Sequence, residues 1–137
     1  MVSHPDDYEE ELRKETARKF RELVAWQKGI ALARLVYTLT AFEPPLPATG
    51  QVQRLRQTAI LISSNVGEAQ MAGSPAEQVV FLEQALAGLS ELEDQLDLAV
   101  QGRVLVAGDL FSLRDNVSQL RRMLRDLVQD RLYPRSP

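Results

Sequence analysis

The sequence lacks cysteine altogether and has a single histidine, His4, among its 137 residues. The absence of cysteine excludes disulfides, thiolate nucleophiles and cysteine-ligated metals. It is also compatible with a reducing cytoplasm, where we expect the protein to be located. One histidine near the N-terminus cannot supply a Ser-His-Asp set or the paired Glu-x-x-His motifs of a di-iron bundle. The sequence therefore predicts no enzymatic activity, no catalytic residue, no cofactor and no metal site.

Long apolar runs and a strong charge excess are also missing. No apolar run approaches the ~20 residues that span a bilayer, and the opening "MVSHPDDYEEELRKE" has no apolar segment typical of a secretory signal. The net charge is −3, so a nucleic-acid surface would have to come from local clusters of arginine and lysine. What is present, 45% apolar and 26% charged residues, is typical of one soluble globular domain.

Four stretches show the alternating spacing of three and four residues that is typical of amphipathic helices. In the first stretch, residues 20–42, the predicted core stripe is Leu23, Trp26, Ile30, Ala33, Tyr37 and Thr40. In the second it is Val52, Leu55, Ala59, Ile62, Val66 and Ala69. The third carries Leu82, Ala85, Leu89, Leu92, Leu96 and Ala99, and the fourth carries Leu110, Leu113, Val117, Leu120, Leu124 and Leu127.

The ends of these helices have recognisable signals. "EPPLPATG" must end the first helix, and Ser74 with Pro75 and Glu77 forms an N-cap for the third. Gly102 marks the end of the third helix, and Tyr133 precedes a proline at the end of the fourth. We predict an all-α, up-down-up-down four-helix bundle over residues 20–133, with a charged and frayed helical extension over 1–19 and a tail over 134–137.

The first two predicted helices are too apolar for a bundle that stays alone. Five side chains fall outside the predicted core stripes and form a candidate oligomer interface: Leu32, Val36, Leu39, Ile60 and Leu61. Together they would expose more than the roughly 300–600 Å² of apolar patch usual for monomers, which favours self-association. The alternative is a wide core stripe with scattered surface leucines, which is common in monomers.

A polar cluster interrupts the second helix at "SSNVGEA". Ser64 and Glu68 are four residues apart and can touch, and Asn65 lies on the shoulder of the core stripe. A carboxylate near a subunit interface requires a cation, for which Lys28 and Arg56 are candidates. The cluster is either a polar recognition site or a hydrogen-bonded seam that keeps helices in register, as polar groups in bundle cores do elsewhere.

Basic residues occur at two places that could contact nucleic acid. Arg121, Arg122 and Arg125 lie on the fourth predicted helix, and Arg54 and Arg56 lie at the start of the second. Phosphate binding by these side chains is one interpretation. The other is that they cover apolar surface and pair with nearby acids such as Asp126. The acids of "SELEDQLD" lie mainly opposite a leucine stripe, which is typical of a solvated helix face.

A resemblance to a known family runs in register from about Phe20 to Ala99. It rests on "FRELVAWQKG", "VYTLTAFEP", "QRLRQTAILISSNVGEA" and "FLEQALAGLSELEDQLDLA", and "LRRMLRDL" in the fourth helix is similar to the family's end. The family consists of four-helix-bundle proteins encoded by intervening sequences of 23S ribosomal RNA genes. The accessory protein of diversity-generating retroelements, which partners a reverse transcriptase, is related to it.

The resemblance implies a homopentameric barrel and a role as a nucleic-acid or ribonucleoprotein-binding accessory protein, with a reverse transcriptase among the possible partners. Three features differ from the family pattern. Its Ala-Glu-Gly is here Gly67-Glu68-Ala69, the second arginine of its Arg-Arg pair is Gln57, and this chain is acidic whereas the retroelement proteins are basic. A protein-binding oligomeric scaffold without direct nucleic-acid contact is the alternative, with the acidic surface meeting a basic partner.

Overall fold

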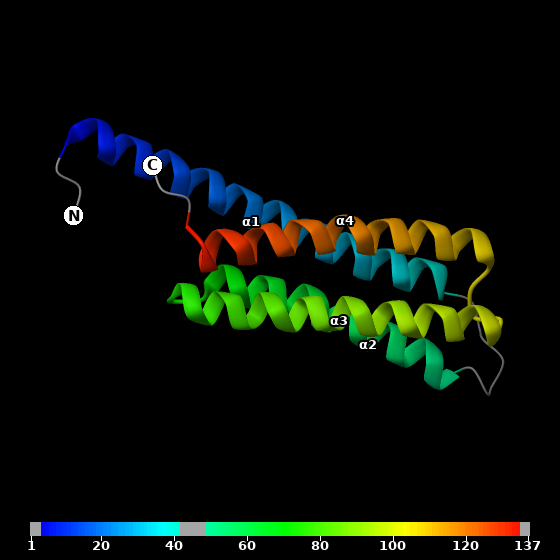
Figure 1. Ribbon diagram of the computed structural model, residues 1–137. Coiled ribbons are helices and arrows are strands. Elements are labelled where there is room, and N and C mark those ends of the chain that lie inside the picture. Colours follow the sequence, from blue (N-terminus) through cyan, green and yellow to red (C-terminus); the bar gives the residue numbers. More distant parts are fainter. Residues whose placement is uncertain (1–3, 42–48, 135–137) are drawn as a thin grey trace.

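Four antiparallel helices make up the structure, a computed structural model that describes residues 4–41 and 49–134. The helices are α1 (Pro5–Leu39), α2 (Thr49–Met71), α3 (Pro75–Gln101) and α4 (Ala107–Leu132). Figure 1 shows them lying side by side and alternating in direction, with the N-terminal part of α1 projecting past the other three. Neighbours in the bundle are α1 with α2, α2 with α3, α3 with α4, and α4 with α1, so α2 and α4 lie diagonally opposite. The predicted four-helix fold is confirmed.

The helix ends follow the predicted capping chemistry. The Ser74 side chain accepts a hydrogen bond from the backbone N–H of Glu77 at 3.2 Å, with Pro75 in the first turn of α3. The Glu77 carboxylate in turn accepts from the backbone N–H of Gly73 at 3.1 Å. Gly102 caps the other end of α3. Most of the proline-rich link, residues 42–48, lies outside the described residues, as do residues 1–3 and 135–137 of the predicted tails.

The core stripes predicted for α2 and α3 are buried in full, and that of α4 is buried except for the half-buried Leu110. In α1 the prediction was wrong by one residue along the helix. The side chains that face the core are Glu22, Ala25, Gly29, Leu32 and Val36. Of the stripe that was predicted instead, Leu23 and Tyr37 are 36% and 42% exposed, and Trp26, Ile30 and Ala33 are half-buried. Its last member, Thr40, is buried as predicted.

This rotation of α1 also overturns part of the predicted oligomer interface. Leu32 and Val36 are each 1% exposed within one chain, so they cannot meet a second one, and Leu39 packs partly against the core. Ile60 and Leu61 are 43% and 59% exposed, as the prediction requires. The physical reason is the close approach of α1 and α2 at Gly29. A Cβ atom there would lie 3.3 Å from the backbone Cα of Ser63.

The boundary predicted at residue 19 does not interrupt α1, which is continuous from Pro5 to Leu39. Residues 4–17 are exposed, and Arg18 is the first side chain in the helix that is half-buried. His4 caps the helix, because its Nδ1 accepts a hydrogen bond from the backbone N–H of Asp6 at 3.2 Å. The predicted boundary therefore lies inside one continuous helix. That the residues before it fold separately from the bundle stays a prediction.

Candidate functional site

The polar cluster on α2 is not a buried seam within the chain. Ser64 and Glu68 are exposed and Asn65 is half-buried. Neither predicted cation reaches Glu68. Lys28 donates to the side chain of Gln119 on α4 at 3.1 Å, and Arg56 turns toward the end of α1. Among the described residues of one chain, Glu68 is therefore neither buried nor paired, because Ser64 and Glu68 lie on the side of α2 away from the core. The predicted seam between subunits stays a prediction.

The small residues near the cluster act in packing. A Cβ added to Gly67 would lie 3.0 Å from the indole Nε1 of Trp26, so the glycine makes room for the tryptophan on α1. Gly29 approaches the backbone of α2 at Ser63, on the adjoining turn. A mid-helix glycine costs about 1 kcal/mol relative to alanine, and this close helix crossing offsets that cost. The glycine of "SSNVGEA" is therefore a packing device, whereas Ser64 and Glu68 stay on the surface.

Arg56 has a structural partner rather than a free guanidinium. Its Nε and Nη2 donate to the hydroxyl and the backbone carbonyl of Thr40 at 3.0 and 2.8 Å. The guanidinium also lies over the ring of Tyr37, 4.7 Å from its centroid. A cation at this place stabilises the C-terminus of α1, whose last carbonyls carry partial negative charge. Arg56 therefore fastens the end of α1 to α2.

The other arginine candidates do not form one surface. Arg54 lies on α2 and the remaining three lie on α4, the diagonally opposite helix. Arg121 pairs with Glu93 of α3. Arg122 and Arg125 are exposed, and among residues 4–41 and 49–134 neither has an ion-pair partner. Arg122 and Arg125 are thus the two arginines of α4 that are both exposed and unpaired among the described residues, and the acids near them in sequence, such as Asp126, do not bind them.

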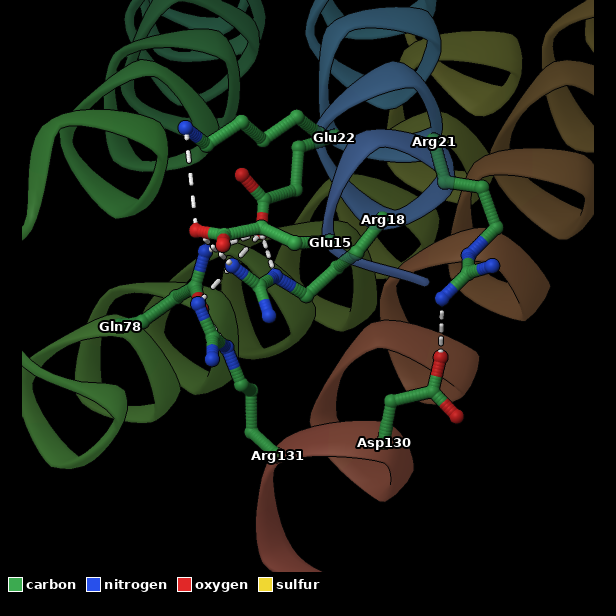
Figure 2. Close-up of polar contacts among 8 residues, drawn as sticks. Glu15, Arg18, Arg21, Glu22, Gln78, Asp130 and Arg131 are labelled. Carbon is green, nitrogen blue, oxygen red and sulfur yellow. Dashed lines mark hydrogen bonds and ion pairs between the residues drawn. The ribbon is translucent and has the colours of Figure 1, made fainter. Parts of the chain in front are cut away.

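A charged cluster that the sequence did not predict lies where α1, α3 and the end of α4 meet (Figure 2). We call it the bundle-end cluster; it consists of Glu15, Arg18, Lys19, Glu22, Gln78 and Arg131. At its centre are two buried side chains, Glu22 at 6% and Gln78 at 3% exposure. Glu22 Oε1 accepts a hydrogen bond from Gln78 Nε2 at 2.6 Å and lies 3.3 Å from Arg18 Nε.

Arg131 completes the cluster from α4. Its Nε donates to Gln78 Oε1, and its Nη2 lies 3.9 Å from Glu22 Oε1. Burial lowers the pKa of Arg131, and the positive charge of Arg18 lowers it further, while Glu22 and Glu15 oppose both effects. Beside the cluster, Arg21 pairs with Asp130, which Figure 2 shows as a separate contact. The sequence does carry one signal for this cluster, because Glu22 lies on the stripe of α1 that faces the core. That signal can be recognised only once the rotation of α1 is known.

The bundle-end cluster borders a pocket of about 310 Å³. Its walls come from α1, from the turn between α2 and α3, and from Arg131 near the end of α4. In the part of the chain that the structure describes, no group of three or more His, Asp or Glu side chains is placed to hold a metal ion. No helix there is both long and apolar enough to cross a membrane.

Comparison with protein families gives the clearest relationship. The model of the 23S rRNA-intervening sequence protein family matches residues 21–126, which is most of the chain. The protein belongs to this family. The match includes the core-facing stripe of α1, all of α2 and α3, and α4 as far as Asp126, so the family is defined over the bundle itself.

A solved structure supports the fold of this 23S rRNA-intervening sequence protein. It is a protein of unknown function from the S23 ribosomal protein family of Bacteroides thetaiotaomicron, with a TM-score of 0.70 and 18% sequence identity. The alignment covers 80% of this chain and 98% of that one, so nearly the whole of that protein shares its fold with this chain. The comparison with curated proteins found no match.

Proposed function

We propose that this member of the 23S rRNA-intervening sequence protein family is a non-enzymatic, cytoplasmic accessory protein that assembles into a homo-oligomer and binds nucleic acid or a ribonucleoprotein. The observation that carries the proposal is the outward row of α4. Side chains 111, 115, 118, 122, 125 and 129 lie within about 80° of one another at 100° per residue, all are exposed, and Asp115 is the one carboxylate among them. In this row Arg122 and Arg125 combine with Phe111, Ser118 and Gln129, which can contact phosphates and unstacked bases.

Self-association uses a different face. Trp26 contacts Gly67, which turns the flank of α1 that carries Leu23 and Tyr37 toward α2. On α2 the exposed Ile60 lies about 20° from Gly67 at 100° per residue, and Gly67 is where α2 meets Trp26 of α1. An apolar surface shared by α1 and α2 supports an oligomer, and the family resemblance favours five subunits. Since α4 is diagonal to α2, assembly through this face leaves the α4 row outward in every subunit.

In an oligomer each subunit presents one copy of the α4 row. These copies together offset the net negative charge of each chain, which disfavours nucleic-acid binding. Two free arginines per subunit bind weakly alone, but copies held in one particle act at high effective concentration on a single nucleic acid. A ribonucleoprotein such as a reverse transcriptase with its RNA is the class of partner that the resemblance implies. This gives an acidic protein a route to salt-sensitive nucleic-acid binding.

The first test is a salt titration of RNA binding. The parent should show a negative slope of log affinity against log salt, and Arg122→Gln or Arg125→Gln should each reduce that slope by about one phosphate contact. The control is Lys14→Gln, which removes the same charge from the projecting part of α1, where Lys14 pairs with Glu10. Equal losses in all three variants would show that only net charge matters and would contradict a site on α4.

The second test concerns assembly. Ile60→Glu should lower the particle mass in light scattering, because a charge at a desolvated contact costs several kcal/mol unless it is paired. The control is Val80→Glu, the same kind of change at a 53% exposed position of α3. A parent that is already monomeric at micromolar concentration would refute the oligomer.

The alternative function, a protein-binding scaffold, has its own observation. The α3 helix contains six acidic residues and no lysine or arginine: Glu77, Glu83, Glu91, Glu93, Asp94 and Asp97. Arg114 and Arg121 occupy two of them. The rest present an acidic face to a basic partner. An oligomer that binds no RNA even at low salt supports this scaffold over the nucleic-acid proposal.

A further inference from the structure

The pocket beside the bundle-end cluster has the size of a small ligand site. Its volume of about 310 Å³ is at the lower end of the range of roughly 300–1,000 Å³ found for small-molecule sites. Arg18 and Lys19 of α1 and Arg131 of α4 line it, together with Ser74 and Gln70 from the region of the α2–α3 turn. Cations from two helices therefore converge on one cavity.

The two arginines of the pocket have more donors than the protein has acceptors for them. A guanidinium has five N–H donors. Arg18 donates to Glu15 through Nη2, whereas its buried Nε has no hydrogen-bond partner among the described residues, although Glu22 Oε1 is 3.3 Å away. Arg131 uses Nε for Gln78, and its Nη2 is 3.9 Å from Glu22, beyond hydrogen-bonding distance. Both guanidinium groups therefore have capacity for another acceptor.

The charges of the pocket also favour an anion. Three cations, Arg18, Lys19 and Arg131, stand against two carboxylates, Glu15 and Glu22, which leaves one positive charge in excess. The positive charge of Arg18 contributes to lowering the pKa of Arg131, so the two guanidinium groups repel each other. An oxyanion between them would relieve this repulsion and supply the missing acceptors.

We propose that this pocket binds a phosphate group between Arg18 and Arg131, at a site separate from the α4 row. The planar fork of a guanidinium matches two oxygens of a phosphate, and two forks from different helices can grip one group from two sides. The single excess charge equals the charge of a phosphodiester or of a monoanionic phosphate. Buried Glu22 and Gln78 then act as positioning residues that hold Arg18 and Arg131 in place.

The test is a titration of the full chain with inorganic phosphate, in which binding is measured by calorimetry or phosphorus NMR. Chloride is adjusted to hold the ionic strength constant. We expect saturable binding of about one phosphate per chain. Arg18→Lys and Arg131→Lys keep the charge but lose the fork, so each should weaken binding about tenfold. Arg21→Lys is the matched control, because Arg21 is an ion-paired arginine of the same helix that does not line the pocket.

The outcomes separate cleanly. Absence of saturable phosphate binding by the parent, or an equal loss in Arg21→Lys, would overturn the proposal. If the two lysine variants melt earlier than the control, Lys19→Gln decides, because Lys19 is 69% exposed and can be changed without disturbing the core. Weaker phosphate binding by that variant supports the site, and unchanged binding overturns it.

A competition experiment then identifies the source of the phosphate. An RNA oligonucleotide with a 5′-phosphate is compared with the same oligonucleotide ending in a 5′-hydroxyl, each in competition with inorganic phosphate. Displacement by the first alone assigns the pocket to a nucleic-acid end, displacement by both assigns it to the phosphodiester backbone, and displacement by neither assigns it to a free phosphate. None of these measurements depends on Arg122 or Arg125. If the proposed nucleic-acid site on α4 is refuted, the proposal of a phosphate site in the pocket still stands or falls on its own result.

Discussion

Replacing Gly88 with alanine should destabilise the protein, although alanine is the better helix former. A Cβ at this position of α3 would lie 2.8 Å from Cγ1 of Ile62 on α2, a contact that requires something to move. Ile62 is 0% exposed and belongs to the α2–α3 contact, the most extensive in the bundle, so it has little room to yield. The overpacking cost of about 1–3 kcal/mol therefore opposes a helix-propensity gain of about 1 kcal/mol, which leaves a net destabilisation of up to about 2 kcal/mol.

Gly108→Ala provides the reference for this measurement. No atom lies within 4 Å of a Cβ at Gly108, which is in the first turn of α4. This substitution should stabilise by up to about 1 kcal/mol, so the two alanine variants should differ in free energy of unfolding by about 1–3 kcal/mol. Urea unfolding at one fixed protein concentration gives the values, because self-association makes stability depend on concentration.

A double-mutant cycle isolates the contact. In an Ile62→Ala background the obstructing Cγ1 is absent, so Gly88→Ala should lose its cost, with a coupling energy of about 1–3 kcal/mol. If Gly88→Ala stabilises the parent as much as Gly108→Ala does, the packing of α2 on α3 differs from the structure and the reasoning is refuted.

Two further predictions concern the bundle-end cluster and the projecting part of α1. Glu22→Ala should cost about 1–3 kcal/mol in thermal unfolding. This is less than the full cost of breaking a buried pair, because Arg18 and Arg131 remain about 20% exposed. Glu22→Gln should cost less than Glu22→Ala because it keeps the shape and one acceptor. Equal losses of stability in the two variants would show that the hydrogen bonds of Glu22 do not stabilise the cluster. Deleting residues 1–14 should change stability by less than about 0.5 kcal/mol, whereas deleting residues 1–19 should destabilise measurably because it also removes Arg18. Equal melting temperatures for the two deletions would contradict a role for Arg18 in the bundle.

The sequence by itself determined three of the four helix faces. In α2, α3 and α4 one apolar stripe continues along the whole helix, and the apolar residues outside it, such as Ile60 and Leu61 of α2, form no second stripe of that length, so the observed rotation buries the continuous stripe. The end signals were equally local. A serine N-cap followed by proline, and a glycine at the other end of α3, act within a few residues and need no tertiary partner. The family resemblance likewise rested on motifs readable along the chain.

Only the tertiary structure decided which face of α1 is buried, and with it most of the candidate site. This helix is apolar on two adjoining stripes, one through Leu23 and Tyr37 and one through Leu32 and Val36, and both fit a period of 3.6 residues. Hydrophobicity alone does not separate them. The choice follows from shape, because Gly29 lets α1 approach the backbone of α2 closely, and that approach turns Leu32, Val36 and the polar Glu22 inward. Glu22 then meets Arg18, one turn away on α1, and Arg131, 109 residues farther along the chain, and a spacing of that length carries no local signal.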